Sequence, residues 1–148
     1  AIPATGRFVV REKFVVAKKP VRIVWVGDDF KQWFLGKVEE SVAETILGYE
    51  DLLKLSFDNE ILAELGDKAE TTLGQIYALI ERQKNGEPGV LLTKGLVNDN
   101  IFYIRDVNGR LRAVIVSSRK VGWIVHTPYS IARPPGREAG VRVFSRDS

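Results

Sequence analysis

Apolar residues at both ends of the chain follow the patterns of β-strands, rich in valine, isoleucine and aromatic side chains. Near the start of the chain these segments span residues 7–16 and 21–26. From residue 90 onward they recur as the short segments 90–93, 101–106, 111–117, 122–126 and 141–145. Glycine, asparagine and proline residues separate many of them. The pattern predicts two N-terminal strands and four or five C-terminal strands.

In the middle of the chain, the spacing of apolar residues changes to the period of an α-helix. Phe30, Trp33 and Phe34 share one face of a short helix, with Asp28 or Asp29 as its N-cap. The clearest helix is predicted over 67–84, because Asp67 and Glu70 have the spacing of a capping box and Gly86 supplies a stop. Its apolar positions are Ala69, Leu73, Ile76, Tyr77 and Ile80. Residues 38–57 fit either an extended edge or an irregular helix.

The order of the predicted elements along the chain, with strands at both ends and helices in the middle, predicts an α+β fold. We expect residues 1–148 to form a single globular domain, in which an antiparallel C-terminal sheet packs on the helix 67–84. The N-terminal strands would either extend that sheet or cover its second face. The length suffices to bury a sizeable core.

Residues 102–114 predict a hairpin, because Asn108-Gly109 is a strong signal for a type I′ turn. A two-residue turn would place Arg105 opposite Arg112. It would also gather four polar side chains on one face, namely Tyr103, Arg105, Arg110 and Arg112. Like charges directly opposite on a sheet repel. The predicted pair therefore requires an anion, either from the chain's own acidic middle or from a partner.

Charge is segregated along the chain. The net charges of residues 1–37, 38–90 and 91–148 are +5, −8 and +6, which give +3 for the whole chain. One interpretation is that the three blocks pack together and partly neutralise each other. The other is that a basic face remains open to an anionic partner.

The C-terminal strands interleave aromatic and basic residues, as a nucleic-acid face would. The aromatic residues are Tyr103, Trp123, Tyr129 and Phe144, among Arg105, Arg112, Arg119, Lys120, Arg133 and Arg142. The alternative is that Trp123 and Phe144 belong to the core and the arginines are solvated or paired. No nucleic-acid-binding motif of known spacing decides between these.

Signals for catalysis are weaker. His126, with Thr127, Tyr129 and Lys120 nearby, resembles the set that a metal-independent ribonuclease uses, but cleavage usually needs a second acid–base partner. A histidine at a strand end is the simpler interpretation. Asp28-Asp29 could hold a metal or cap a helix. The chain has no cysteine and one histidine, which excludes disulfides, thiolate metal sites and multi-histidine zinc sites.

The segments 63–95 and 100–116 and the closing residues Arg142–Ser148 resemble a family of short bacterial proteins of uncharacterised function, commonly predicted from candidate-phylum genomes, that end in a VFSR-like motif. The resemblance covers most of the chain from Val21 onward. It implies a stand-alone small bacterial domain, and no activity or site residue comes with it.

We therefore expect a small binding module without a cofactor, for an anionic partner, nucleic acid first or an acidic protein surface. The candidate binding residues are Tyr103, Arg105, Arg110, Arg112, Arg119 and Lys120. The alternative is a protein-interaction or self-assembly module in which the acidic middle of one copy meets the basic sheet of another. No apolar run is long enough to span a membrane, and no long apolar segment opens the chain, so we expect a cytoplasmic protein.

Overall fold

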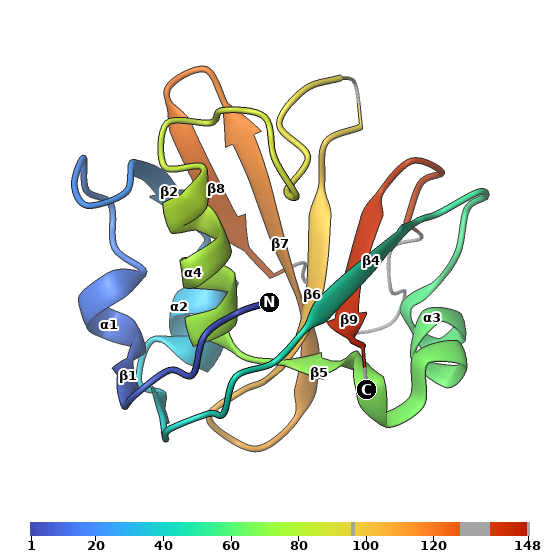
Figure 1. Cartoon of the computed structure of the whole chain (residues 1–148), viewed down its shortest axis with the longest axis horizontal. Coiled ribbons are helices and arrows are strands. Elements are labelled where there is room, and N and C mark those ends of the chain that lie inside the picture. Colours follow the sequence, from blue (N-terminus) through green and yellow to red (C-terminus); the bar gives the residue numbers. More distant parts are fainter. Residues whose placement is uncertain (96, 128–136, 148) are drawn as a thin grey trace.

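The computed structural model describes residues 1–95, 97–127 and 137–147 and combines helices and strands in an α+β fold (Figure 1). The main sheet contains, in spatial order, β2 (Ile23–Val26), β8 (Gly122–His126), β7 (Leu111–Arg119), β6 (Asn100–Arg105), β9 (Arg142–Arg146) and β4 (Leu47–Asp51). A further short strand, β5 (Glu70–Thr71), pairs with β6 beside β9. A separate pair is formed by β1 (Phe8–Val9) and β3 (Val38–Glu39).

The main sheet is mixed, which corrects the prediction of an antiparallel C-terminal sheet. The pairs β6–β7, β7–β8 and β4–β9 are antiparallel, whereas β2 pairs with β8 in parallel and β6 pairs in parallel with both β9 and β5. Parallel pairing joins strands that are distant in the sequence. Hairpin signals between neighbouring segments therefore cannot predict it. The segment 21–26 does extend the sheet, through β2.

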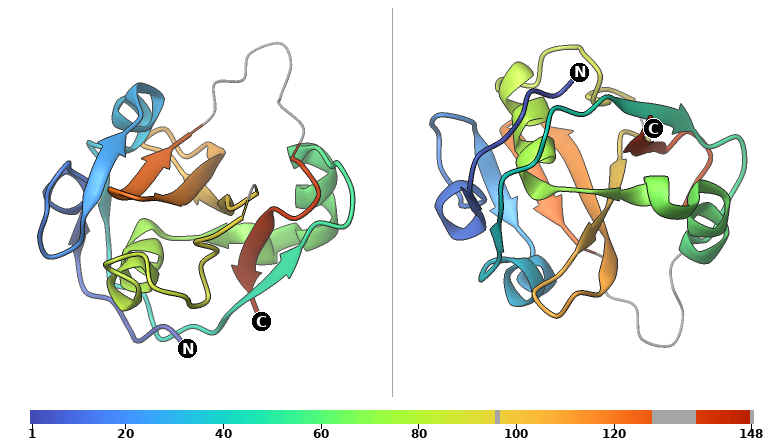
Figure 2. Two further views of the ribbon diagram at one scale, coloured as in Figure 1. Left: turned by 90° about the horizontal axis from the view of Figure 1, so that it is seen from above. Right: turned by 60° about the horizontal axis from the view of Figure 1, so that its bottom comes forward.

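The helices cover two different parts of the sheet (Figures 1 and 2). The helices α1 (Val10–Lys13), α2 (Asp28–Phe34) and α4 (Leu73–Arg82) lie beside β2, β8 and β7, where Phe14, Phe34 and Ile76 join Trp123 and Val125 in the larger core. On the other face, Ile61 of α3 (Asp58–Leu65) packs with Ile101, Tyr103 and Val143 in a second cluster.

The predicted strand 7–16 is mostly wrong. Only Phe8–Val9 is extended, and the chain then turns into α1. Val10 and Phe14 lie four residues apart, and both are buried in the larger core beside Tyr77 of α4. Residues four apart lie on the same face of a helix, and they also lie on the same face of a strand. The burial of Val10 and Phe14 against α4 therefore fits a helix as well as a strand. The run of valines and aromatic residues favoured the strand, which was wrong. Residues 90–93, also predicted as a strand, do not form one: Val90 and Leu91 are bends, and Leu92 and Thr93 have no regular secondary structure.

The central helix begins later than predicted. Gly66–Ala69 form a 3-10 turn, η1, and Glu70–Thr71 are extended beside β6, so α4 starts at Leu73. Its N-cap is Thr72, whose hydroxyl accepts from the Gln75 N–H at 3.2 Å, while the Gln75 side chain accepts from the Thr72 N–H at 2.9 Å. The capping box is therefore Thr72–Gln75 rather than Asp67–Glu70.

Candidate nucleic-acid interface

The β6–β7 hairpin has a different register from the one predicted. Arg105 pairs with Leu111 and Ile104 pairs with Arg112, one residue out of step with the expected Arg105–Arg112 pair. The turn is not type I′, because Asn108 has a negative φ and only Gly109 is left-handed, at +79°. When the register of a strand pair shifts by one residue, side chains that were expected on the same face of the sheet lie on opposite faces. Arg105 and Arg112 consequently lie on opposite faces of the sheet.

The carboxylate of Asp106 organises this turn. It accepts hydrogen bonds from the backbone N–H groups of Asn108 at 2.8 Å and Arg110 at 3.0 Å, and from the Arg112 side chain at 2.6 Å. The Asp106 N–H bonds the carbonyl of Arg110 and the Gly109 N–H bonds the carbonyl of Asp106, which closes a three-residue loop. Burial alone would raise the pKa of Asp106, but these three hydrogen bonds hold it below its ordinary value.

Two of the three hairpin arginines, Arg105 and Arg112, are paired within the chain. The guanidinium of Arg112 bonds Asp106 and lies 3.4 Å from the ring centroid of Trp33 on α2. Arg105 pairs with Glu70 at 3.3 Å and donates to the carbonyl of Gly109 at 3.0 Å. Arg105 receives its anion from the acidic middle, and Arg112 from the turn itself.

Tyr103 is buried rather than exposed, with 1% of its surface accessible. Its hydroxyl donates to the Asp58 carboxylate at 2.8 Å, and Arg137 binds the same carboxylate through two hydrogen bonds at 3.0 and 2.8 Å. Burial and the adjacent Asp58 charge raise the pKa of Tyr103 well above its usual range. Tyr103 thus holds α3 against the sheet, and its ring is not available to a base.

The remaining predicted binding residues lie at two ends of β7. Arg110 is exposed beside the β6–β7 turn, whereas Arg119 and Lys120 are exposed at the β7–β8 turn. Nine residues of extended strand separate Arg110 from Arg119, or about 30 Å. The six predicted residues therefore do not form one face.

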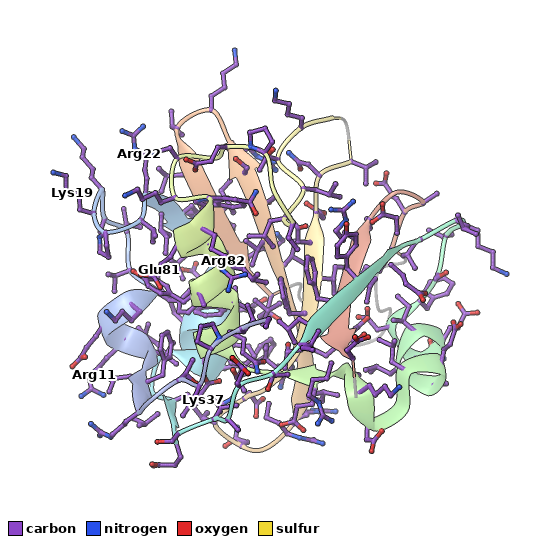
Figure 3. All side chains as sticks on the ribbon, in the orientation of Figure 1. Arg11, Lys19, Arg22, Lys37, Glu81 and Arg82 are labelled. Atoms are coloured by element: carbon purple, nitrogen blue, oxygen red, sulfur yellow. The ribbon has the colours of Figure 1, made fainter. Side chains whose placement is uncertain are left out.

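Arg119 and Lys120 meet other cations that the sequence-based prediction did not include. We call this region the basic end and define it as Lys19, Arg22, Lys84, Arg119 and Lys120, all of which are exposed. The Arg22 carbonyl accepts from the Trp123 N–H at 2.8 Å, which places Arg22 beside the β7–β8 turn. Lys19 precedes Arg22 in the same loop, and both project from the same corner of the molecule (Figure 3).

Lys84 reaches the basic end from α4. The preceding residue, Gln83, accepts a hydrogen bond from the indole N–H of Trp123 at 2.9 Å, and a Cβ at Gly86 would lie 3.0 Å from the Ser118 hydroxyl. The nearby Glu87 binds the backbone N–H of Asn85 at 2.7 Å. Among the described residues, none of the five basic-end side chains forms an ion pair.

An exposed tryptophan lies next to this end. Trp25 of β2 has 49% of its surface accessible, and its ring centroid is 5.7 Å from that of His126. Trp25 pairs with Ile124, two residues along β8 from Gly122 at the turn, a spacing of about 7 Å. Arg119 also lines a polar cavity of about 220 Å³, whose other polar lining residues are Asn98, Asp99, Arg137 and Glu138. The exposed Trp25 ring therefore lies on the strand next to the basic end, about two residues along the sheet from the β7–β8 turn and on the side of His126.

His126 ends β8, which agrees with the simpler interpretation of this residue. Burial lowers its pKa; the Asp99 charge opposes the shift, and Arg137 and Arg119 add to it. Ser117 lies on the same face, but only 1% of its surface is accessible, so a substrate cannot reach its hydroxyl. Trp123 and Phe144 belong to the core, and Tyr129 and Arg133 lie outside the described residues.

Asp28 and Asp29 lie in the first turn of α2, and the N-cap is Gly27 rather than either aspartate. Gly27 joins β2 to α2, and a Cβ at this position would lie 2.8 Å from the Cβ of His126 on β8, so a larger residue would require β8 to shift. Both aspartates lie in the first turn of the helix, where the helix dipole favours a negative charge. Within the described ranges, no group of three or more histidine, aspartate or glutamate residues could hold a metal ion.

Comparison with known proteins does not identify a relative: no protein-family model, curated protein or solved structure matches the chain. In the part of the chain that the structure describes, no helix has the length and apolarity needed to cross a bilayer.

Proposed function

We propose that the protein is a non-catalytic binding module for single-stranded nucleic acid, which it contacts through the basic end and Trp25. The observation that carries this proposal is that five exposed cations from three separate segments come together at one end of the sheet, whereas other cations of the chain are paired. Arg105, Arg112, Arg137 and Arg142 are neutralised by carboxylates of the chain. The basic-end cations are exposed and have no ion-pair partner among the described residues.

The chemistry of this surface fits a phosphate backbone with accessible bases. Lysine and arginine neutralise phosphates and release bound counterions, which makes such binding strong at low salt. The half-exposed ring of Trp25 offers a face on which an unpaired base can stack. Bases are stacked inside a duplex, so the surface favours single strands.

The test is fluorescence anisotropy of labelled single-stranded RNA and DNA of mixed sequence at low salt. We expect the double variant Arg119→Gln/Lys120→Gln to weaken binding about tenfold, because two phosphate contacts are lost. Trp25→Ala should cost about 1–3 kcal/mol if one base stacks on it.

The matched control is Lys54→Gln/Lys68→Gln, which removes the same charge from exposed lysines outside the basic end. This variant should bind nearly as the wild type does. Equal losses in both double variants would show that only net charge matters. Absence of binding by the wild-type protein at low salt would overturn the proposal.

A further inference from the structure

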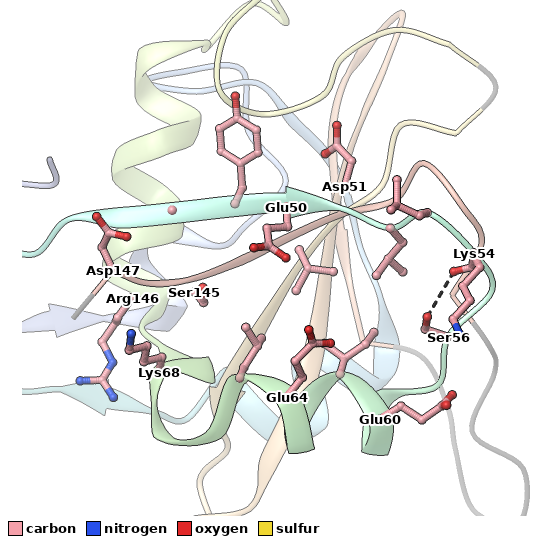
Figure 4. A pocket seen from close by; sticks show the side chains of 17 residues that line it. Glu50, Asp51, Lys54, Ser56, Glu60, Glu64, Lys68, Ser145, Arg146 and Asp147 are labelled. Atoms are coloured by element: carbon pink, nitrogen blue, oxygen red, sulfur yellow. Dashed lines mark hydrogen bonds between the residues drawn. The ribbon is translucent and has the colours of Figure 1, made fainter.

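The strand β4 has one unpaired edge beside a large groove (Figure 4). The groove has a volume of about 720 Å³ and lies between β4 and α3, with Val143 and Ser145 of β9 among its lining residues. We call it the β4–α3 groove. Glu50 projects into it from β4 and Glu64 from α3, while Lys68 lies at one end.

The direction of the β4 backbone groups follows from two hydrogen bonds. The Ile46 carbonyl accepts from the Asp147 N–H at 2.9 Å, and the Leu52 N–H donates to the Val141 carbonyl at 2.9 Å. Backbone groups alternate between the two edges of a strand. Even-numbered residues of β4 therefore face β9, and the N–H and C=O groups of Leu47, Tyr49 and Asp51 face the unpaired edge.

The chain already pairs along this same edge just before β4. Ile2 and Thr45 exchange hydrogen bonds of 2.7 and 3.0 Å, and Thr5 and Val42 exchange bonds of 2.8 and 2.9 Å, both in antiparallel bridges. The N-terminus consequently lies beside the start of β4 (Figure 1). Beyond Thr45 the edge is open over Leu47–Asp51 among the described residues. An added strand would continue the line of these two isolated antiparallel bridges.

We propose that this edge binds an extended, basic segment of a partner protein as an additional antiparallel strand, with its lysine or arginine side chains in the β4–α3 groove. Charge selects the occupant. The groove lining holds five carboxylates, from Glu50, Asp51, Glu60, Glu64 and Asp147, against three cations, from Lys54, Lys68 and Arg146, so carboxylates outnumber cations. Those of Glu50, Glu60 and Glu64 form no ion pair among the described residues. A basic side chain on the groove side of the added strand lies directly beside Glu50 and faces Glu64.

The same charges act against pairing of two copies through β4. An antiparallel β4–β4 pair would bring the acidic residues Glu50 and Asp51 of both copies together, and charges on an edge strand commonly prevent such self-association. Beyond β4, Leu53 has 96% of its surface accessible and Leu55 has 59%. A partner that continues past Asp51 would cover these two leucines, which supports a longer extended segment.

The probe is a short fluorescent peptide that alternates valine with lysine, and binding is followed by anisotropy at moderate salt. Glu50→Lys/Glu64→Lys should weaken binding at least about tenfold, because two attractive pairs become repulsive. The matched control is Glu44→Lys/Glu81→Lys, which reverses two exposed carboxylates that do not line the groove and should leave the affinity within about twofold of the wild type.

Two further peptides test the strand-like mode of binding. A peptide that alternates valine with glutamate should not bind. Two methylated forms of the lysine peptide are compared, one with N-methyl groups on all the valines and one with them on all the lysines. Each form cannot donate backbone hydrogen bonds from one of its two edges, so one form should lose binding and the other should keep it. Equal affinity for both methylated peptides, or equal losses in the groove and control variants, would overturn the proposal. These peptide experiments do not test nucleic-acid binding, which is proposed for the basic end and Trp25.

Discussion

Asp106 determines where the arginines of the β6–β7 hairpin point. Its side chain takes three hydrogen bonds, and the Val107 N–H reaches the carbonyl of Trp33 at 2.9 Å, so the loop needs three residues rather than two. The local signal of Asn108-Gly109 correctly predicted a hairpin. It could not predict the register, because the register depends on Trp33, which is distant in the sequence. The same reason explains why the expected Arg105–Arg112 pair is not formed.

His126 provides a test at the scale of one residue, because it is the only histidine of the chain. Burial lowers its pKa below the ordinary value of 6.5, so the unfolded chain takes up a proton before the folded protein does. The free energy of unfolding should therefore fall as the pH drops below about 6.5. Above that pH both states are neutral at this position and no change is expected.

The measurement is urea-induced unfolding of the wild type and of His126→Gln at pH 7.5 and 5.5. The wild type should lose stability between these values, and the variant should lose less. Parallel losses in both proteins would show that His126 does not carry the effect.

At the scale of elements, α4 shows how a distant carboxylate completes a helix start. Glu39 of β3 is buried and accepts from the backbone N–H groups of Leu73 at 2.8 Å and Gly74 at 2.9 Å, with Lys37 at 3.3 Å. Two of the unpaired donors of the first turn are thereby satisfied, and the negative charge faces the positive end of the helix dipole. The helix is thus fixed to the β1–β3 pair.

Glu39→Gln should destabilise the protein by about 1–2 kcal/mol, because an amide retains one acceptor oxygen and loses the charge. Urea-induced unfolding measures this change. Glu40→Gln, at the exposed neighbouring position, is the matched control and should remain within about 0.5 kcal/mol of the wild type. Equal stability of the two variants would contradict the role of Glu39.

Some elements could be predicted from periodicity and others could not. The strands β6, β7, β8 and β9 and the helix α2 occur close to their predicted positions, because their apolar patterns are local. β5 could not be predicted, since Glu70–Thr71 become extended only by pairing in parallel with Tyr103–Ile104 of β6. The spacing of Thr72 and Gln75 did contain the signal for the true start of α4, which the Asp67–Glu70 spacing obscured.

At the scale of the whole molecule, the ion pairs mostly join different charge blocks. Four of the five ion pairs among the described residues join a basic block to the acidic middle, through Glu39, Asp51, Asp58 and Glu70. Segregation of charge along the sequence therefore does not by itself indicate an open basic face. The basic end differs because its cations come from three separate segments, which only the tertiary structure brings together.

The claim that the basic end binds single-stranded nucleic acid is tested most directly by the salt dependence of binding. Each phosphate contact on a single strand contributes about −0.7 to the slope of log K against log salt concentration. If five basic-end cations make contacts, the wild-type slope should be about −3.5, and Arg119→Gln/Lys120→Gln should reduce its magnitude by about 1.4. Lys54→Gln/Lys68→Gln should leave the slope unchanged. A slope near zero, or the same reduction in both variants, would contradict the claim.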